Sequence, residues 1–450
     1  MSRESTLFFL HGLGLGAGAA TALAEELAGT ADVVGIDLPG FGSAAGAGAG
    51  GVEDMVGWVE QRIGEHGSTR WGLIGHSMGG KIASIVADRA IAGASGLFGL
   101  RGIILLAASP LSPEPMDEQR RQQMLEWASS TAISAEHAAT FIDANTAAGL
   151  SEAARQRAID LVTTSSAAAW RGWLLRGSRE DWSEQAGAVS PVPALIIAGA
   201  EDGDDLGAAA QARLNSPRFT DALGVEIPGS GHLVMIEQPE LVAEHIRRFW
   251  TGFADTAPIV PEGTARAIAS PRTSARTRGI LAKRALSDSA GYRPMVLDER
   301  QLETLRMLAA HIVVQHDPPI DLAARVDRQL ADGTGDGWRN ADLPDDASAY
   351  RLGLDALSDW AQKPPVMRED DLRDLAAGRW SGGGLDGAHM AAWFEDARVD
   401  ITRQWLAHPA TMARIGFDGF ANGGDGTRLQ GFTDLRAGAD ETWEPRREGR

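Results

Sequence analysis

Short apolar runs alternate with helical patterns through the first 110 residues. Each run precedes glycine or another turn signal, and the runs are Thr6 to Leu10, Asp32 to Ile36, Trp71 to Ile74 and Gly102 to Leu106. Two more runs follow at Ala194 to Ala198 and Val225 to Ile227. Unbroken apolar runs are typical of strands that are buried on both faces of a parallel sheet. The alternation therefore predicts βαβ units and an α/β fold with a doubly wound, mostly parallel sheet.

The segment from about residue 110 to 190 interrupts this alternation. It has no convincing strand, and its large apolar residues recur at helical spacing: Met124, Trp127, Phe141, Leu161, Trp170, Trp173 and Leu174. Because strands resume at Ala194, we expect residues 110–190 to form a helical cap inserted into an α/β domain of residues 1–253.

Apolar periodicity fades between residues 254 and 292. From Gly263 to Ser287 every charged residue is basic: Arg266, Arg272, Arg276, Arg278, Lys283 and Arg284. A flexible linker is the simpler interpretation, and a basic strap that docks on an acidic surface is the alternative. Beyond it the pattern is wholly helical, which predicts a separate all-α domain over residues 293–450.

Charge and composition exclude several classes of partner and site. The 450 residues carry a formal net charge of -19, which disfavours binding to nucleic acid and to anionic membranes. The chain has no cysteine, so disulfides, thiolate metal sites and thiol catalysis are excluded. The apolar run before His11 is shorter than a secretory signal needs, and no stretch of about 18 apolar residues is present. We therefore expect a cytoplasmic protein.

Residues Gly75 to Gly79 read G-H-S-M-G, a G-x-S-x-G motif between an apolar run and a helical pattern. A nucleophile elbow needs this context, because its glycines allow the tight turn that lifts the serine hydroxyl out of the sheet. The motif predicts Ser77 as a catalytic nucleophile.

A serine hydroxyl needs an imidazole base, and the imidazole needs a carboxylate that orients it. Asp202 follows one predicted strand and His232 follows the last one, at the ends where open α/β sheets gather their sites. We predict His232 as the base and Asp202 as the acid. The neighbouring Glu201, Asp204 and Asp205 are alternatives for the acid.

Residues 5–253 resemble the α/β-hydrolase superfamily. The resemblance rests on motifs in a fixed order: His11 to Gly14 (H-G-L-G), Gly35 to Gly42 (G-I-D-L-P-G-F-G), the Ser77 elbow, and the loops of Asp202 and His232. It implies a catalytic triad of Ser77, His232 and Asp202.

The same resemblance implies further roles. The backbone N–H groups of Leu13 and Met78 would form the oxyanion hole, while His11 and Asp37 would order loops. The aromatic residues of the cap are candidates for substrate contact, with plain packing as the alternative, and they are Trp127, Phe141, Trp170 and Trp173.

The region from about residue 290 to 435 resembles the small third subunit of gluconate 2-dehydrogenase-type complexes. The resemblance rests on Leu302 to Asp317, Ile320 to Leu330, Phe394 to Leu406, and His408-Pro409 with Ile415 to Gly419. It implies a flavin-dependent dehydrogenase of the glucose-methanol-choline type as a partner.

We expect no cofactor and no metal in this chain, because the histidines of the second half lack the spacing of a ligand set; they are His311, His316, His389 and His408. The leading interpretation is a serine hydrolase of a small ester or lactone, of carboxylesterase or lactonase type, whose C-terminal domain binds a flavin-dependent sugar or alcohol dehydrogenase. Two alternatives stay open: a non-catalytic assembly subunit of a flavoprotein dehydrogenase complex, and a carbon-carbon bond hydrolase with the same triad.

Overall fold

A computed structural model describes residues 5–48, 50–130, 132–147, 149–185, 189–289, 291–315, 318–335, 337, 340–363, 365–380, 384–417, 419–420 and 423–425. In this part of the chain six strands form one sheet in the order β2-β1-β3-β4-β5-β6, and all neighbouring strands are parallel. The strands are β1 (Ser5–Leu10), β2 (Ala31–Ile36), β3 (Trp71–His76), β4 (Leu100–Leu106), β5 (Ala194–Gly199) and β6 (Ala222–Ile227). The predicted parallel α/β sheet is confirmed.

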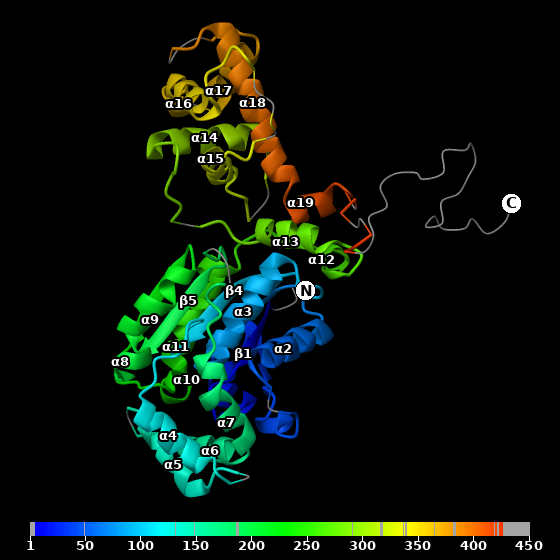
Figure 1. The fold of residues 1–450 in the computed structure, drawn as a ribbon. Helices are drawn as coiled ribbons and strands as arrows, with labels where there is room; N and C mark the ends of the chain where they lie inside the picture. Colours follow the sequence, from blue (N-terminus) through cyan, green and yellow to red (C-terminus); the bar gives the residue numbers. More distant parts are fainter. Residues whose placement is uncertain are drawn as a thin grey trace, which may run out of the picture.

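The burial of each strand follows from its place in the sheet. The four central strands, β1, β3, β4 and β5, are buried along their whole length, whereas the edge strands β2 and β6 are partly exposed. Helices cover the sheet on both faces, so a central strand meets apolar neighbours on either side (Figure 1). These helices are α1 (Thr21–Glu26), α2 (Val52–His66), α3 (Met78–Ala92), α8 (Gly203–Leu206), α9 (Ala208–Leu214), α10 (Val234–Glu237) and α11 (Pro239–Phe249).

Helices α4 to α7 lie between β4 and β5 in sequence and form a cap below the sheet in Figure 1. They are α4 (Glu118–Trp127), α5 (Ala135–Ala144), α6 (Glu152–Thr163) and α7 (Ala167–Leu175). Each begins after a residue whose side chain accepts a backbone N–H of the first turn, and these residues are Asp117, Ser134, Ser151 and Ser166. Such N-caps compensate for the unpaired N–H groups at a helix start.

The segment that we expected to be a flexible linker instead forms two helices, α12 (Glu262–Ala269) and α13 (Ala275–Arg284). Helix α13 packs against α3, where Arg278 is buried and its Nε donates to the carbonyl of Gly93 at 2.6 Å. Gly279 lies so close to α3 that a Cβ there would be 2.8 Å from the Ala92 carbonyl oxygen. The two helices also share an apolar cluster, which includes Ile268 of α12 and Leu281 of α13. The Arg278 guanidinium contacts the C-terminal end of α3, which attracts cations, and also the Asp425 carboxylate at 3.2 Å.

The helices of the C-terminal region surround an apolar core of their own that includes Tyr350, Trp360 and Trp393. They are α14 (Glu299–Ile312), α15 (Leu322–Asp332), α16 (Asp346–Ala356), α17 (Pro365–Ala376) and α18 (Gly387–Leu406). The last helix, α19 (Pro409–Arg414), instead packs against the apolar cluster of α12 and α13. Figure 1 places all of these helices on the side of the sheet opposite the cap. Within the resemblance to the dehydrogenase subunit, His316, Asp317, Asp418 and residues 426–435 lie outside the described residues.

Candidate active site

Ser77 is the single residue between β3 and α3, and its backbone is strained, with φ of 49° and ψ of -120°. Positive φ at a non-glycine residue persists only where the surroundings enforce it. Here Gly75 and Gly79 provide the space: a Cβ on Gly75 would lie 2.7 Å from the Gly79 oxygen, and one on Gly79 would lie 2.2 Å from the Leu10 oxygen. The predicted elbow therefore has the geometry that presents a serine hydroxyl.

His232 and Asp202 meet beyond the carboxyl ends of β6 and β5. The Nδ1 atom of His232 lies 2.9 Å and 3.1 Å from the two carboxylate oxygens of Asp202. Burial by itself would lower the pKa of His232, but the charge and hydrogen bond of Asp202 outweigh burial and raise it above 6.5. The pair leaves Nε2 as the ring nitrogen that is available to a substrate or a nucleophile.

The other acids near Asp202 do not contact His232. Glu201 and Asp204 are exposed, and Asp205 lines the pocket from α8 without replacing Asp202 at the Nδ1 atom. The side chain of Asp202, by contrast, is turned inward, and 9% of it is exposed. The geometry therefore favours Asp202 over the alternative acids.

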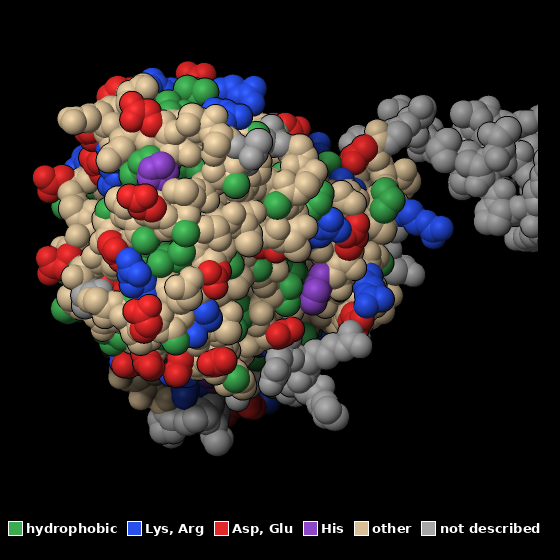
Figure 2. Space-filling view, turned by 90° about the horizontal axis from the view of Figure 1, so that it is seen from below, with side chains coloured by type: hydrophobic (Ala, Val, Ile, Leu, Met, Phe, Trp, Pro, Cys, Tyr) green, Lys and Arg blue, Asp and Glu red, His purple; other side chains and the backbone are tan. Residues whose placement is uncertain are grey.

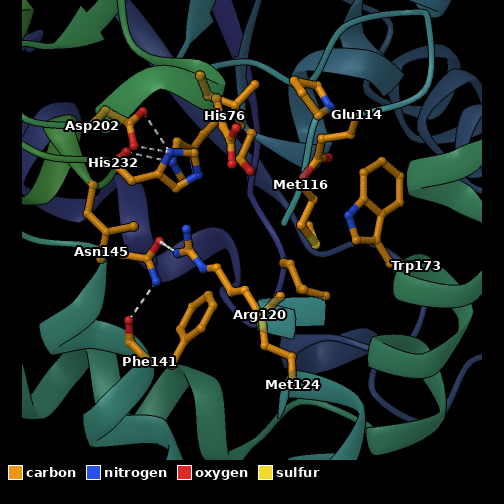
Figure 3. Close-up of a pocket in the computed structure, with 16 residues that line it drawn as sticks. His76, Glu114, Met116, Arg120, Met124, Phe141, Asn145, Trp173, Asp202 and His232 are labelled. Carbon is orange, nitrogen blue, oxygen red and sulfur yellow. Dashed lines mark hydrogen bonds and ion pairs between the residues drawn. The ribbon is translucent and has the colours of Figure 1, made fainter. Parts of the chain in front are cut away.

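Ser77, His232 and Asp202 line one pocket beneath the cap, together with Leu13 (Figure 3). Met78 is the first residue of α3, so its backbone N–H has no carbonyl partner within the helix. Leu13, the other residue that the resemblance implies for an oxyanion hole, lines the same pocket. The cavity holds about 60 Å³, whereas a single water occupies roughly 10–15 Å³ by this measure, so the enclosed space fits a small group.

The structure divides the four aromatic candidates of the cap. Phe141 and Trp173 line the pocket, whereas Trp127 and Trp170 do not. Trp127 stacks on His137 with ring centroids 5.4 Å apart, and Trp170 is buried against the loop of Gly14, where a Cβ would be 2.5 Å from its ring. The expected substrate contact is therefore wrong for these two tryptophans, because neighbouring side chains of the cap and the loop cover them.

His11 and Asp37 hold loops together. The Nε2 atom of His11 accepts the N–H of Leu38 at 3.0 Å, and burial lowers the pKa of His11 to about 4. The Asp37 carboxylate accepts the N–H groups of Ala17 and Ser43 at 2.7 Å and 2.8 Å. Neither residue lines the pocket, which agrees with a structural role.

Sequence reasoning missed several residues of the pocket, namely His76, Glu114, Arg120 and Asn145. His76 donates from Nε2 to the carbonyl of His232 at 3.0 Å, and its burial holds its pKa well below 6.5. Glu114 is buried and accepts the Ser109 hydroxyl at 2.6 Å, and burial raises its pKa. Glu114 lies in the loop that follows β4, so its place after a strand was a usable signal. The cap residues Arg120 and Asn145 gave no such signal, because they reach the pocket only through the way in which the cap packs over the sheet.

Within the described residues, no group of three or more His, Asp and Glu side chains is arranged to hold a metal ion. Nor does the described part of the chain contain a helix with the length and apolarity to cross a membrane. Figure 2, a view from the cap side, shows Asp and Glu side chains interspersed with Lys and Arg, without a continuous basic area among the coloured residues.

Comparisons with known proteins relate this chain to a family and to solved structures. Residues 7–245 match the model of the "Alpha/beta hydrolase family". A comparison with curated proteins found no match. Among solved structures, an esterase from Exiguobacterium antarcticum shares 17% identity over 56% of this chain and 93% of its own, with a TM-score of 0.48. An esterase from Thermogutta terrifontis shares 20% identity over 56% of this chain and 91% of its own, with a TM-score of 0.44. Since the family match spans more than half of the 450 residues, this chain belongs to the alpha/beta hydrolase family.

Proposed function

We propose that this protein is a serine hydrolase of small esters or lactones. The observation that carries the proposal is the convergence of three side chains from different loops in one pocket: strained Ser77, and His232 in a hydrogen bond with Asp202. Each of these groups is weak alone, and their combination is what nucleophilic catalysis by serine requires.

In the proposed reaction, Ser77 Oγ attacks the acyl carbon while His232 Nε2 takes its proton. The N–H groups of Leu13 and Met78 stabilise the oxyanion, and the Asp202 carboxylate stabilises the imidazolium. The bond to the leaving oxygen then breaks, and His232 returns the proton to that oxygen. A water, activated in the same way, hydrolyses the acyl-enzyme and frees Ser77.

A covalent label tests this chemistry. Diethyl 4-nitrophenyl phosphate should release 4-nitrophenol and leave a diethylphosphoryl group on the peptide that contains Ser77, because an activated serine displaces the phenolate. The Ser77→Ala protein should stay unlabelled. Labelling of another residue, or of none, would refute the proposal and favour the non-catalytic assembly subunit.

A substrate panel then distinguishes the bond that is cleaved. Turnover of aryl esters and sugar lactones supports the proposal, whereas turnover confined to vinylogous diketones supports the carbon-carbon bond hydrolase. The small cavity favours short acyl groups within each class.

We propose further that the C-terminal helical domain binds a flavin-dependent dehydrogenase of the glucose-methanol-choline type. Two features of the domain support a role in holding another protein. None of its described residues lines the catalytic pocket, and it exposes large apolar side chains, among them Val314, Ile415 and Phe417. Pull-down of the full chain from native cells tests this, and recovery of the chain without a flavoprotein would refute it.

A further inference from the structure

Arg120 brings a cationic group from the cap helix α4 to the catalytic pocket. Its Nη2 donates to Asn145 Oδ1 at 2.8 Å, and in Figure 3 its side chain extends toward Asn145 and His232. Within the described residues no carboxylate lies at ion-pair distance from Arg120, whereas the nearby Arg121 and Arg179 both contact Glu118. Arg120 thus differs from its neighbours in having only a neutral side-chain partner.

The stability of α4 does not explain a cation at this position. Arg120 is the third residue of the helix, where the positive end of the helix dipole disfavours a positive side chain. Only its backbone serves the helix, since its N–H donates to Asp117 at 2.8 Å. The side chain is exposed to solvent, so its charge remains available to a ligand of the pocket.

Asn145 fixes the direction of this side chain. It is buried, and its Nδ2 donates to the carbonyl of Phe141 at 2.6 Å, so its Oδ1 faces Arg120. The guanidinium keeps further N–H donors for an anion. Its planar fork matches a carboxylate, which it binds through two parallel hydrogen bonds.

The acids of the pocket do not occupy Arg120. Asp202 is paired with His232, and Glu114 is held by Ser109 in a buried setting that raises its pKa. Asp205 is exposed on α8 and forms no ion pair with Arg120 among the described contacts.

We propose that Arg120 binds a carboxylate carried by the substrate, so that short esters or lactones with an anionic acyl part are preferred over neutral ones. This inference rests on the proposed serine hydrolase function and names its substrate class. The enclosed space beside Ser77 limits the acyl part to a short chain between the scissile carbonyl and the carboxylate.

The test compares two esters of similar length, monomethyl succinate and methyl butyrate, by release of methanol. The wild-type protein should show the higher kcat/KM on the succinate ester. Arg120→Gln should lower the ratio of the two kcat/KM values by about tenfold or more, since a charge-assisted pair is lost, and Arg120→Lys should lower it less. Arg179→Gln removes a cationic side chain elsewhere on the cap and should keep the wild-type ratio. Equal ratios in the wild type and in Arg120→Gln would overturn the inference.

Two further readouts separate this inference from the proposed function. Calorimetric titration with succinate needs no turnover, and the affinity should fall about tenfold or more in Arg120→Gln. The charge of Arg120 also lowers the pKa of His232, so its removal should move the acid limb of the pH profile to higher pH. Binding of succinate through Arg120 without hydrolysis of either ester would refute only the hydrolase proposal. Succinate affinity that is equal in both proteins would refute the anion site.

Discussion

The backbone carbonyl of Asn145, in the cap, accepts the N–H of His232 at 3.0 Å, so the proposed catalytic base is hydrogen-bonded directly to the cap. The same carbonyl accepts the N–H of Leu233 at 3.2 Å. The Glu237 carboxylate reinforces the contact, since it accepts the N–H of Gly231 at 2.9 Å and that of Ala147 at 2.8 Å. The cap therefore positions the catalytic loop as well as covering the pocket.

This contact predicts that Gly231→Ala impairs catalysis. A Cβ at position 231 would lie 3.0 Å from the Ala147 nitrogen and 3.1 Å from the Asn145 oxygen, so it would push the cap away from the histidine loop. We expect kcat to fall roughly a few-fold, because contacts of this length require a shift of a few tenths of an ångström, whereas misplacement of a catalytic group by about 1 Å costs on the order of 100-fold. Steady-state kinetics measure this change in kcat. Gly224→Ala on edge strand β6 is the matched control, since no atom lies within 4 Å of its added Cβ. An unchanged kcat in Gly231→Ala would show that the contact does not position the base.

Replacement of Ser77 by alanine should abolish turnover and leave the fold intact. Loss of the nucleophile of a serine triad costs on the order of 10⁶-fold in rate. Turnover of a model ester and circular dichroism check both statements. Ser84→Ala removes a buried hydroxyl from α3, the helix that follows Ser77, and should stay active. Substantial esterase activity in Ser77→Ala would end the proposed mechanism.

The pH profile should report His232. The imidazole accepts the serine proton only when neutral, so kcat/KM should rise with pH through the pKa of His232 in the free enzyme. Because the carboxylate of Asp202 raises that pKa above 6.5, the half-maximal point should lie above pH 6.5. A profile that is flat from about pH 5 to 9, with chemistry rate-limiting, would contradict His232 as the base.

Asp202→Asn should change both the rate and the profile. Without the carboxylate, burial dominates and lowers the pKa of His232, so the acid limb should move to lower pH. The rate should fall by about 10⁴-fold, because the imidazolium loses its stabilising charge and the ring its fixed tautomer. Asp204→Asn, which changes an exposed acid in the adjoining helix α8, is the control. An acid limb that stays in place would show that Asp202 does not set the charge state of His232.

Two truncations should separate the roles of the C-terminal segments. A chain that ends after residue 289 keeps α13 on α3 and every residue that lines the pocket, so its kcat/KM on a model ester should match the full chain. A chain that ends after residue 256 loses α13 and the hydrogen bond from Arg278 to Gly93, so its Tm should be lower. Kinetics and thermal unfolding of both proteins test this. An inactive chain of residues 1–289 would indicate that the helical domain takes part in catalysis.

The sheet, the Ser77 elbow and the positions of Asp202 and His232 after their strands could all be predicted from local sequence patterns. Strands buried on both faces must be continuously apolar, and a nucleophile elbow must place glycines such as Gly75 and Gly79 around its serine, so both leave local patterns. Asp202 and His232 could be placed because parallel strands bring their carboxyl ends to one edge.

Only the tertiary structure decided which side chains of the cap reach that edge. Phe141 lines the pocket and Trp170 does not, although both are aromatic residues at helical spacing in the same cap. Likewise the helix around Arg278 was not predicted, because it is short, buries few apolar residues such as Leu281, and is held in part by the hydrogen bond from Arg278 to the Gly93 carbonyl at the end of α3. Arg120 and Asn145 join the site only through the return of the cap onto the histidine loop. Local sequence patterns reflect the requirements of the strand or helix in which a residue lies. Contacts between distant segments depend instead on how those segments pack in three dimensions, which no single segment determines.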